Sequence, residues 1–151
     1  MRYLYFCLFI LINISLISCD LGPDSPRGFS LPAGDINKGA LVLAKHQCLA
    51  CHHIEGIEQA KGINNPDINI RLGGESTQVK TYAELVTSVI NPSHKLTQGY
   101  PLSVVTDNGE SKMSNYNDVM TITELVDLVA FLQSNYSLVP YRNTNYQFYG
   151  Y

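Results

Sequence analysis

The stretch from His46 to Gly56, HQCLACHHIEG, gathers two cysteines and two histidines within residues 48–53. Three chemistries use such a cluster: a metal clip, a redox dithiol and the covalent attachment of a haem. Each of them ties the chain to one local geometry and so restricts the folds that are open to it. The rest of the sequence has to distinguish between the three.

The first 18 residues have the features of an export signal. Arg2 precedes an almost unbroken apolar run to Ile17, and Ser18 stands directly before Cys19. The run is short for a membrane span, which takes roughly 20 residues. Residues 16–19, LISC, resemble the lipobox of bacterial lipoproteins, in which Cys19 would be diacylated and become the first mature residue. We therefore expect residues 1–18 to be a lipoprotein signal peptide; an ordinary signal with a coincidental cysteine is the alternative.

The mature chain is long enough for one small domain. Residues 19–33 hold three prolines and two glycines without apolar periodicity, which predicts a flexible tether. Loss of Arg2 with the signal leaves 9 basic and 13 acidic residues, a formal net charge of −4, so nucleic acid is a poor partner candidate. Residues 137–151 form an aromatic-rich tail. It either folds back over the domain, which we favour, or offers a docking patch to a redox partner.

Between tether and tail, residues 34–136 are the predicted domain. Apolar residues recur at helical spacing in three segments, residues 36–47, 82–90 and 122–136. Asp35 is a candidate cap for the first helix, and Thr121 with Glu124 forms a capping box for the last. Asn108-Gly109 marks a hairpin turn, but strand signals are otherwise few. The sequence predicts an all-α domain whose long loops, above all residues 52–77, need something further to fill its core.

These features distinguish the chemistries of the cysteine cluster. A structural zinc site needs four ligands, usually two close pairs, and no second cysteine pair follows. A redox dithiol starts a helix after a strand, whereas here a predicted helix precedes the cysteines. Cys48-Leu49-Ala50-Cys51-His52 has the C-x-x-C-H spacing of haem attachment, in which two thioethers hold the porphyrin and the histidine lies under the iron. A haem would also fill the missing core, so we favour one covalently attached haem c.

Residues 34–136 resemble a class I, monohaem c-type cytochrome, here in lipoprotein form. The opening GDINKGALVLAKHQCLACH matches the first helix of that family, in which Gly39 and Leu43 pack against Leu128 and Phe131 of the last helix. Leu43 replaces the more usual aromatic residue. The resemblance implies the cytochrome c fold, with three or more helices and long loops wrapped around the haem.

The resemblance implies two further contacts to the haem, both in the segment NNPDINIRLGG. The carbonyl of Pro66 would accept a hydrogen bond from the second ring nitrogen of His52 and so orient this ligand. Asn65 stands where the family usually has glycine. Arg71 falls where the family often has an arginine that binds the haem propionates, and a solvated surface position is the alternative.

The iron would take His52 as one axial ligand. The candidates for the opposite position are Met113, Met120, His46, His53 and His94. The family uses a methionine on the loop before the last helix, commonly followed by a proline and then an aromatic residue. Met113 has this context, with Tyr116 three residues on and Ser114 in place of the proline. Met120 directly precedes the last helix, where it can act as a hydrophobic staple. We therefore expect His52 and Met113 to ligate the iron.

Axial His/Met ligation leaves no open position on the iron, and such a haem exchanges one electron. The resemblance thus implies a one-electron carrier, or an electron-transfer subunit, rather than an enzyme. Its partners would be redox proteins of a respiratory or periplasmic chain. Asp20, directly after Cys19, resembles the signal that retains lipoproteins on the periplasmic side of the inner membrane. The competing class is a sensor, gas-binding or peroxidase-like haem protein with a labile sixth position.

Overall fold

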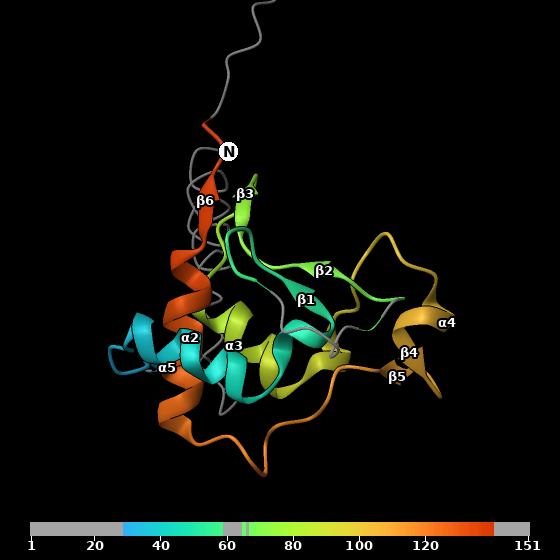
Figure 1. Ribbon diagram of the computed structural model, residues 1–151, viewed down its shortest axis with the longest axis horizontal. Coiled ribbons are helices and arrows are strands. Elements are labelled where there is room, and N and C mark those ends of the chain that lie inside the picture. Colours follow the sequence, from blue (N-terminus) through green and yellow to red (C-terminus); the bar gives the residue numbers. More distant parts are fainter. Residues whose placement is uncertain (1–28, 59–64, 66, 141–151) are drawn as a thin grey trace, which may run out of the picture. The chain divides into compact units, whose positions relative to one another are not determined.

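The computed structural model describes residues 29–58, 65 and 67–140 (Figure 1). The chain divides into two units, Met1–Leu31 and Pro32–Tyr151, and all described helices and strands belong to the second. The predicted signal peptide, Cys19, part of the tether and residues 141–151 of the tail lie outside the described residues. Of the helices that are described, none has the length and apolar character needed to span a membrane.

The three helices predicted from apolar periodicity are confirmed. The helical elements of the described residues are α2 (Ile36–Lys45), η1 (Cys48–Ala50), α3 (Tyr82–Ile90), η2 (Pro92–His94), α4 (Leu102–Val105) and α5 (Ile122–Ser134). The side chain of Asp35 accepts hydrogen bonds from the first turn of α2. The capping box of Thr121 and Glu124 is also confirmed, because each side chain bonds the other's backbone N–H.

The prediction of an all-α domain with the cytochrome c fold is wrong, because the described domain is mixed α and β. Three two-stranded sheets are present in it: β1 (His52–His53) with β2 (Ile70–Arg71), parallel; β3 (Gly74–Ser76) with β6 (Tyr136–Leu138), parallel; and β4 (Thr106–Asp107) with β5 (Glu110–Ser111), antiparallel. Strands of two or three residues are too short to show an alternating apolar pattern. The two parallel pairs also join segments far apart in the chain, so no pattern of neighbouring residues predicts them.

The β4–β5 hairpin is the exception, since its turn was visible in the sequence. Asn108 and Gly109 have φ angles of 49° and 85°. Positive φ at both central residues is the conformation that favours an Asn-Gly pair in a two-residue hairpin. The predicted turn is therefore confirmed.

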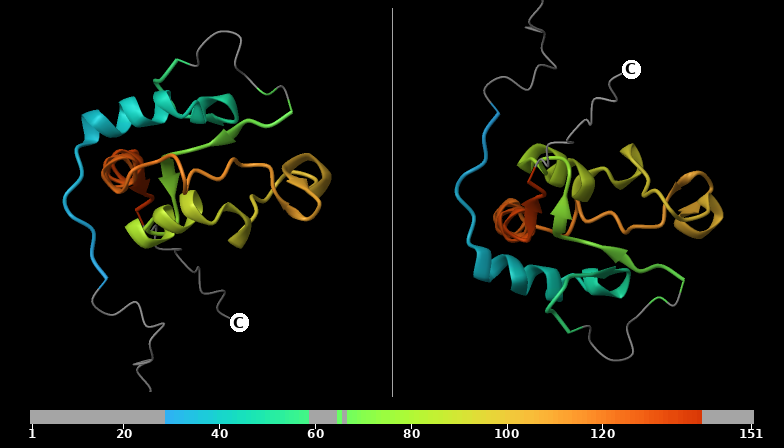
Figure 2. Two further views of the ribbon diagram at one scale, coloured as in Figure 1. Left: turned by 90° about the horizontal axis from the view of Figure 1, so that it is seen from below. Right: turned by 90° about the horizontal axis from the view of Figure 1, so that it is seen from above.

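Helix α5 lies between α2 and α3, and the core forms along both contacts (Figure 2). The approach of α2 to α5 is very close at Gly39, where a Cβ atom would lie 2.1 Å from the carbonyl oxygen of Asp127 and 2.5 Å from Cβ of Phe131. The predicted close contact at Gly39 is thus confirmed. One turn later, Leu43 is only 2% exposed. The buried carboxylate of Asp127 accepts a hydrogen bond of 2.7 Å from the backbone N–H of Asp35, which also ties the start of α2 to α5.

Candidate functional site

The C-x-x-C-H segment lies between the end of α2 and the β1–β2 pair. Gln47 adopts a left-handed conformation, with φ 54°, and turns the chain out of α2 into the short η1 turn that carries Cys48. The carbonyl of Cys51 accepts a 2.9 Å hydrogen bond from the N–H of Ile70, and His52 pairs with Ile70 in the parallel sheet. The end of α2 therefore fixes the start of the cysteine turn, and pairing with β2 fixes the histidine that follows it.

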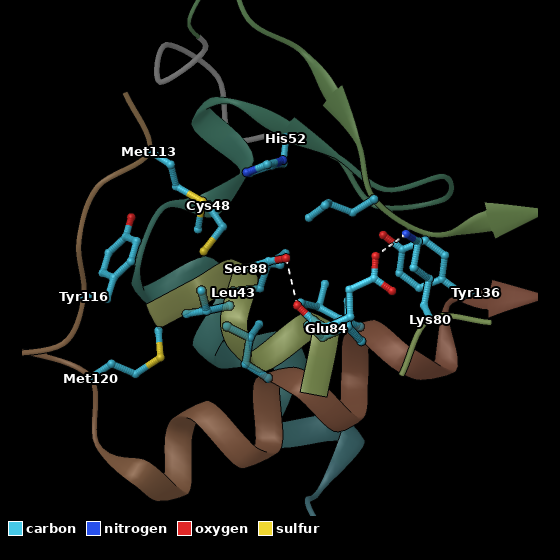
Figure 3. A pocket seen from close by; sticks show the side chains of 15 residues that line it. Leu43, Cys48, His52, Lys80, Glu84, Ser88, Met113, Tyr116, Met120 and Tyr136 are labelled. Atoms are coloured by element: carbon cyan, nitrogen blue, oxygen red, sulfur yellow. Dashed lines mark hydrogen bonds and ion pairs between the residues drawn. The ribbon is translucent and has the colours of Figure 1, made fainter. Parts of the chain in front are cut away.

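A cavity opens beside this segment (Figure 3). The space in it, counted together with its opening to solvent, is about 700 Å³. Five buried apolar side chains from α2, α3 and α5 line it, namely Leu43, Leu85, Val89, Leu128 and Leu132. The cavity thus occupies the place where the three main helices would otherwise complete a core.

Three of the predicted haem residues line this cavity. Cys48 and His52 come from one segment and Met113 from the loop before α5. Cys51 ends the η1 turn, with its N–H donating to the carbonyl of Cys48 at 3.3 Å, but it is not part of the cavity wall. Both cysteines are free thiols. Segments some 60 residues apart in the chain therefore meet at this cavity.

The two further predicted contacts, Pro66 and Arg71, differ in outcome, and Arg71 is not part of the cavity wall. Pro66 lies outside the described residues. Arg71 is exposed on strand β2, where its guanidinium pairs with Glu55 at 3.3 Å and lies over the backbone of Gly74. The histidines 46, 53 and 94 are likewise not among the described residues that line the cavity.

Burial shifts the pKa values of two side chains in the site, His52 and Cys48. Burial lowers the pKa of His52, and a hydrogen bond with the backbone of Ile70 partly opposes that effect. A neutral imidazole is the form that binds metals, so this burial favours ligation. Burial also raises the pKa of Cys48 and keeps its side chain as the thiol.

Both candidate methionines line the cavity, but at different places. In Figure 3 both methionines lie on the side of the cavity opposite Lys80 and Tyr136, and Met120 lies farther from His52 than Met113 does. Met120 also lines a second, adjacent hollow together with Leu125, the partner expected for a staple at the start of α5. The arrangement agrees with separate roles for the two residues.

Tyr116 anchors the loop that carries Met113. Its hydroxyl donates a 3.0 Å hydrogen bond to the carbonyl of His46 at the end of α2. Its ring meets that of His46 edge to face, with centroids 5.2 Å apart. Burial, followed by the negative charge that Cys48 takes on when it ionises, raises the pKa of Tyr116, so the hydroxyl remains protonated and able to donate. The sequence singled out Tyr116 as context for the ligand, but not this contact with α2.

The sequence analysis missed a polar end of the cavity. Lys80 and Glu84 line it and form an ion pair of 2.7 Å, with Lys95 3.5 Å from the same carboxylate oxygen. Hydrogen bonding by Lys80 is the main reason that the pKa of Glu84 is lowered. Tyr136 of β6 lies beside this pair (Figure 3). The available signal was the spacing of four residues between Lys80 and Glu84 at the start of a predicted helix.

No protein-family profile, curated protein or solved structure matches the chain. Within the part of the chain that the structure describes, no three His, Cys, Asp or Glu side chains gather in a way that could hold a metal ion. The cavity residues fit a haem instead. They combine an apolar wall with a thiol, a neutral imidazole and a thioether, and a c-type haem uses these groups for attachment and axial ligation.

Proposed function

We propose that this protein is a membrane-anchored monohaem c-type cytochrome that carries single electrons between redox proteins outside the cytoplasmic membrane. The observation that carries the proposal is the meeting of Cys48, His52 and Met113 at one apolar cavity. The C-x-x-C-H motif is short, and by itself it is only a moderately specific sign of haem attachment. A methionine brought to the same cavity from a distant loop is an independent feature that agrees with it.

Each of these residues would have one role in holding the group. Cys48 and Cys51 would form the two thioethers, and His52 and Met113 would be the axial ligands. A haem held in this way supplies reversible one-electron transfer and, with axial His/Met ligation, a higher reduction potential than with two histidines. The buried leucines of α2, α3 and α5 would give the haem an apolar surface, and Tyr116 holds the methionine loop against α2.

The location of this activity follows from the amino-terminal sequence. A diacylated Cys19 would hold the domain at the membrane, because two acyl chains are enough for stable anchoring. Asp20 favours retention on the periplasmic side of the inner membrane. The tether of residues 19–33 would let the domain reach redox partners in a respiratory or periplasmic chain.

Matured protein tests the proposal directly. After denaturing electrophoresis, haem-peroxidase staining should follow the wild-type band and be absent from the double variant Cys48→Ser/Cys51→Ser. The purified protein should show a single, reversible one-electron redox transition. Haem that is fully removed from the wild type by acid-organic extraction would overturn covalent attachment. Rapid binding of carbon monoxide by the reduced wild type would show an open sixth position and replace electron carriage with the sensor or enzyme alternative.

A further inference from the structure

The polar end of the cavity is built from charged side chains that are partly withdrawn from water. The side chains of Lys80 and Glu84 are 25% and 29% exposed, although Lys and Glu normally lie at the surface. Gln133 of α5 donates a 3.2 Å hydrogen bond to the carbonyl of Lys80, which fixes the backbone from which this lysine projects. A charge pair held at the edge of an apolar cavity is costly unless it meets a further polar group.

This polar end lies across the cavity from the cysteine turn. In Figure 3, Cys48 and Met113 lie on one side of the opening, and Lys80, Glu84 and Tyr136 lie on the other. The covalent structure of haem has the same polarity. The two vinyl groups that form thioethers lie on one half of the porphyrin, and both propionates lie on the opposite half. A porphyrin held through Cys48 would therefore direct its carboxylates towards Lys80.

Lys80 has the chemistry to receive a carboxylate there. Its ammonium has three donors, and Glu84 takes one of them at 2.7 Å. Lys95 lies 3.5 Å from the same carboxylate of Glu84 and shares in neutralising it. Hydrogen bonding by Lys80 lowers the pKa of Glu84, so the pair is ionised at neutral pH. Without Lys80, the negative charges of Glu84 and a propionate would face each other.

We propose that Lys80, rather than Arg71, is the cationic partner of the haem propionates, and that the Lys80–Glu84 pair adjusts the reduction potential of the haem. This inference rests on the proposed function. Arg71 is exposed and already paired with Glu55, and it is not part of the cavity wall. Lys80 is a positioning residue that stabilises the bound carboxylates through its charge.

Redox titration of matured protein with a full complement of haem tests this inference. Oxidised haem carries one more positive charge than reduced haem, so loss of a nearby cation favours the oxidised form. Lys80→Met should lower the reduction potential and change the oxidised-to-reduced ratio at fixed electrode potential by about tenfold, ~59 mV for a one-electron couple. Lys80→Arg should keep the wild-type potential.

Glu84→Gln distinguishes an electrostatic role from a structural one. Removal of this negative charge should raise the potential, the opposite direction to Lys80→Met. If the Lys80–Glu84 ion pair acts only as a structural feature, both substitutions should shift the potential in the same direction. Lys38→Met is the matched control for charge, since Lys38 is 68% exposed on α2 and is not part of the cavity wall.

Three outcomes overturn the inference. One is a Lys80→Met potential equal to that of wild type at full haem content, and another is a potential shift in the same direction for Lys80→Met and Glu84→Gln. The third is a shift with Arg71→Met that Lys80→Met does not produce. In each case covalent haem remains, so the proposed function stands. A wild-type protein without covalent haem would instead overturn the proposed function and this inference with it.

Discussion

The two proposed axial ligands are held in place in different ways. His52 is held by the β1–β2 pair, whereas Met113 depends on a loop that Tyr116 ties to the end of α2. Met120, seven residues later, lines the same cavity but also the hollow beside Leu125. The two methionines are chemically identical, so their substitution separates ligation from packing.

Replacement of Met113 by Leu should remove the iron ligand and leave the apolar volume nearly unchanged. We expect the variant to lose the ferric sulfur-to-iron charge-transfer band, to have a lower reduction potential and to bind carbon monoxide when reduced. Absorption spectroscopy and redox titration measure these changes.

The matched control is Met120→Leu. This variant should keep the charge-transfer band and lose at most about 2 kcal/mol of stability, because Met120 is half-buried. A Met120→Leu variant that loses the band while Met113→Leu keeps it would reverse the ligand assignment.

At the scale of the elements, the contact between α2 and α5 organises the domain. Gly39 allows the two backbones to approach, Asp127 bonds the N–H of Asp35, and Lys45 forms an ion pair with Glu124. These contacts lie at the start, middle and end of α2, so the whole helix is aligned on α5. Because α2 leads directly into the cysteine turn, its packing also determines where Cys48 lies.

Gly39→Ala should separate α2 from α5, since the added methyl group would overlap the Asp127 carbonyl and Phe131 Cβ. Overpacking of this kind costs about 1–3 kcal/mol, and we expect a loss of that size in the free energy of unfolding. Urea denaturation followed by circular dichroism measures it. Leu41→Ala, at a position on α2 that is 71% exposed, is the control and should change stability by less than ~0.5 kcal/mol. Wild-type stability of Gly39→Ala would contradict the close packing.

The Lys45–Glu124 pair predicts a dependence of stability on acid pH. Hydrogen bonding by Lys45, and then by the N–H of Thr121, lowers the pKa of Glu124 from 4.5 to about 2. The lowered pKa in the folded state means that this stabilisation is fully present above pH 4.5 and is lost as the pH falls towards 2. Glu124→Gln should therefore be less stable than wild type at pH 7, and the difference should shrink on acidification.

Urea unfolding midpoints at pH 7 and near pH 2 measure this effect. The same substitution at Glu110, an exposed residue of β5, is the control and should leave the midpoint close to wild type at both pH values. A Glu124→Gln deficit that is equally large at both pH values would mean that the carboxylate acts through its shape and not through its charge.

At the scale of the whole molecule, the described domain is built around a cavity that its own side chains leave open. Apolar side chains of α2, α3 and α5 line this cavity, which opens to solvent. His52 of β1, Tyr136 of β6 and loop residues such as Met113 complete the lining. That the chain needs a bound group to complete its core stays a prediction.

The lipoprotein prediction concerns the molecule as a whole, because it determines where the domain works. Cys19→Ser should abolish acylation, so the protein should move from the membrane fraction to the soluble fraction after cell breakage and washing. Mass spectrometry of the mature amino terminus gives the chemical readout. Ser18→Ala, which keeps a small residue before the cysteine, is the control and should remain at the membrane. An unmodified Cys19 in the wild type would contradict the proposal.

The sequence alone determined the features that depend on neighbouring residues. Helices α2, α3 and α5 followed from apolar spacing and from the caps Asp35 and Thr121. The β4–β5 turn followed from Asn108-Gly109. The grouping of thiols and imidazole at residues 48–52 is also local, and so is the chemistry that it suggests. Such features lie within one or two turns of chain, where spacing and residue type decide the conformation.

Only the tertiary structure decided the features that join distant segments. The parallel pairs β1–β2 and β3–β6 overturned the all-α prediction. The fold also places Lys80 in the cavity wall and leaves Arg71 outside it. Strands of two or three residues form because remote backbone groups find hydrogen-bond partners, and they leave no period in the sequence. The position of the Lys80 charge relative to the cavity likewise depends on the packing of α3 against α5. No spacing along the chain records that packing.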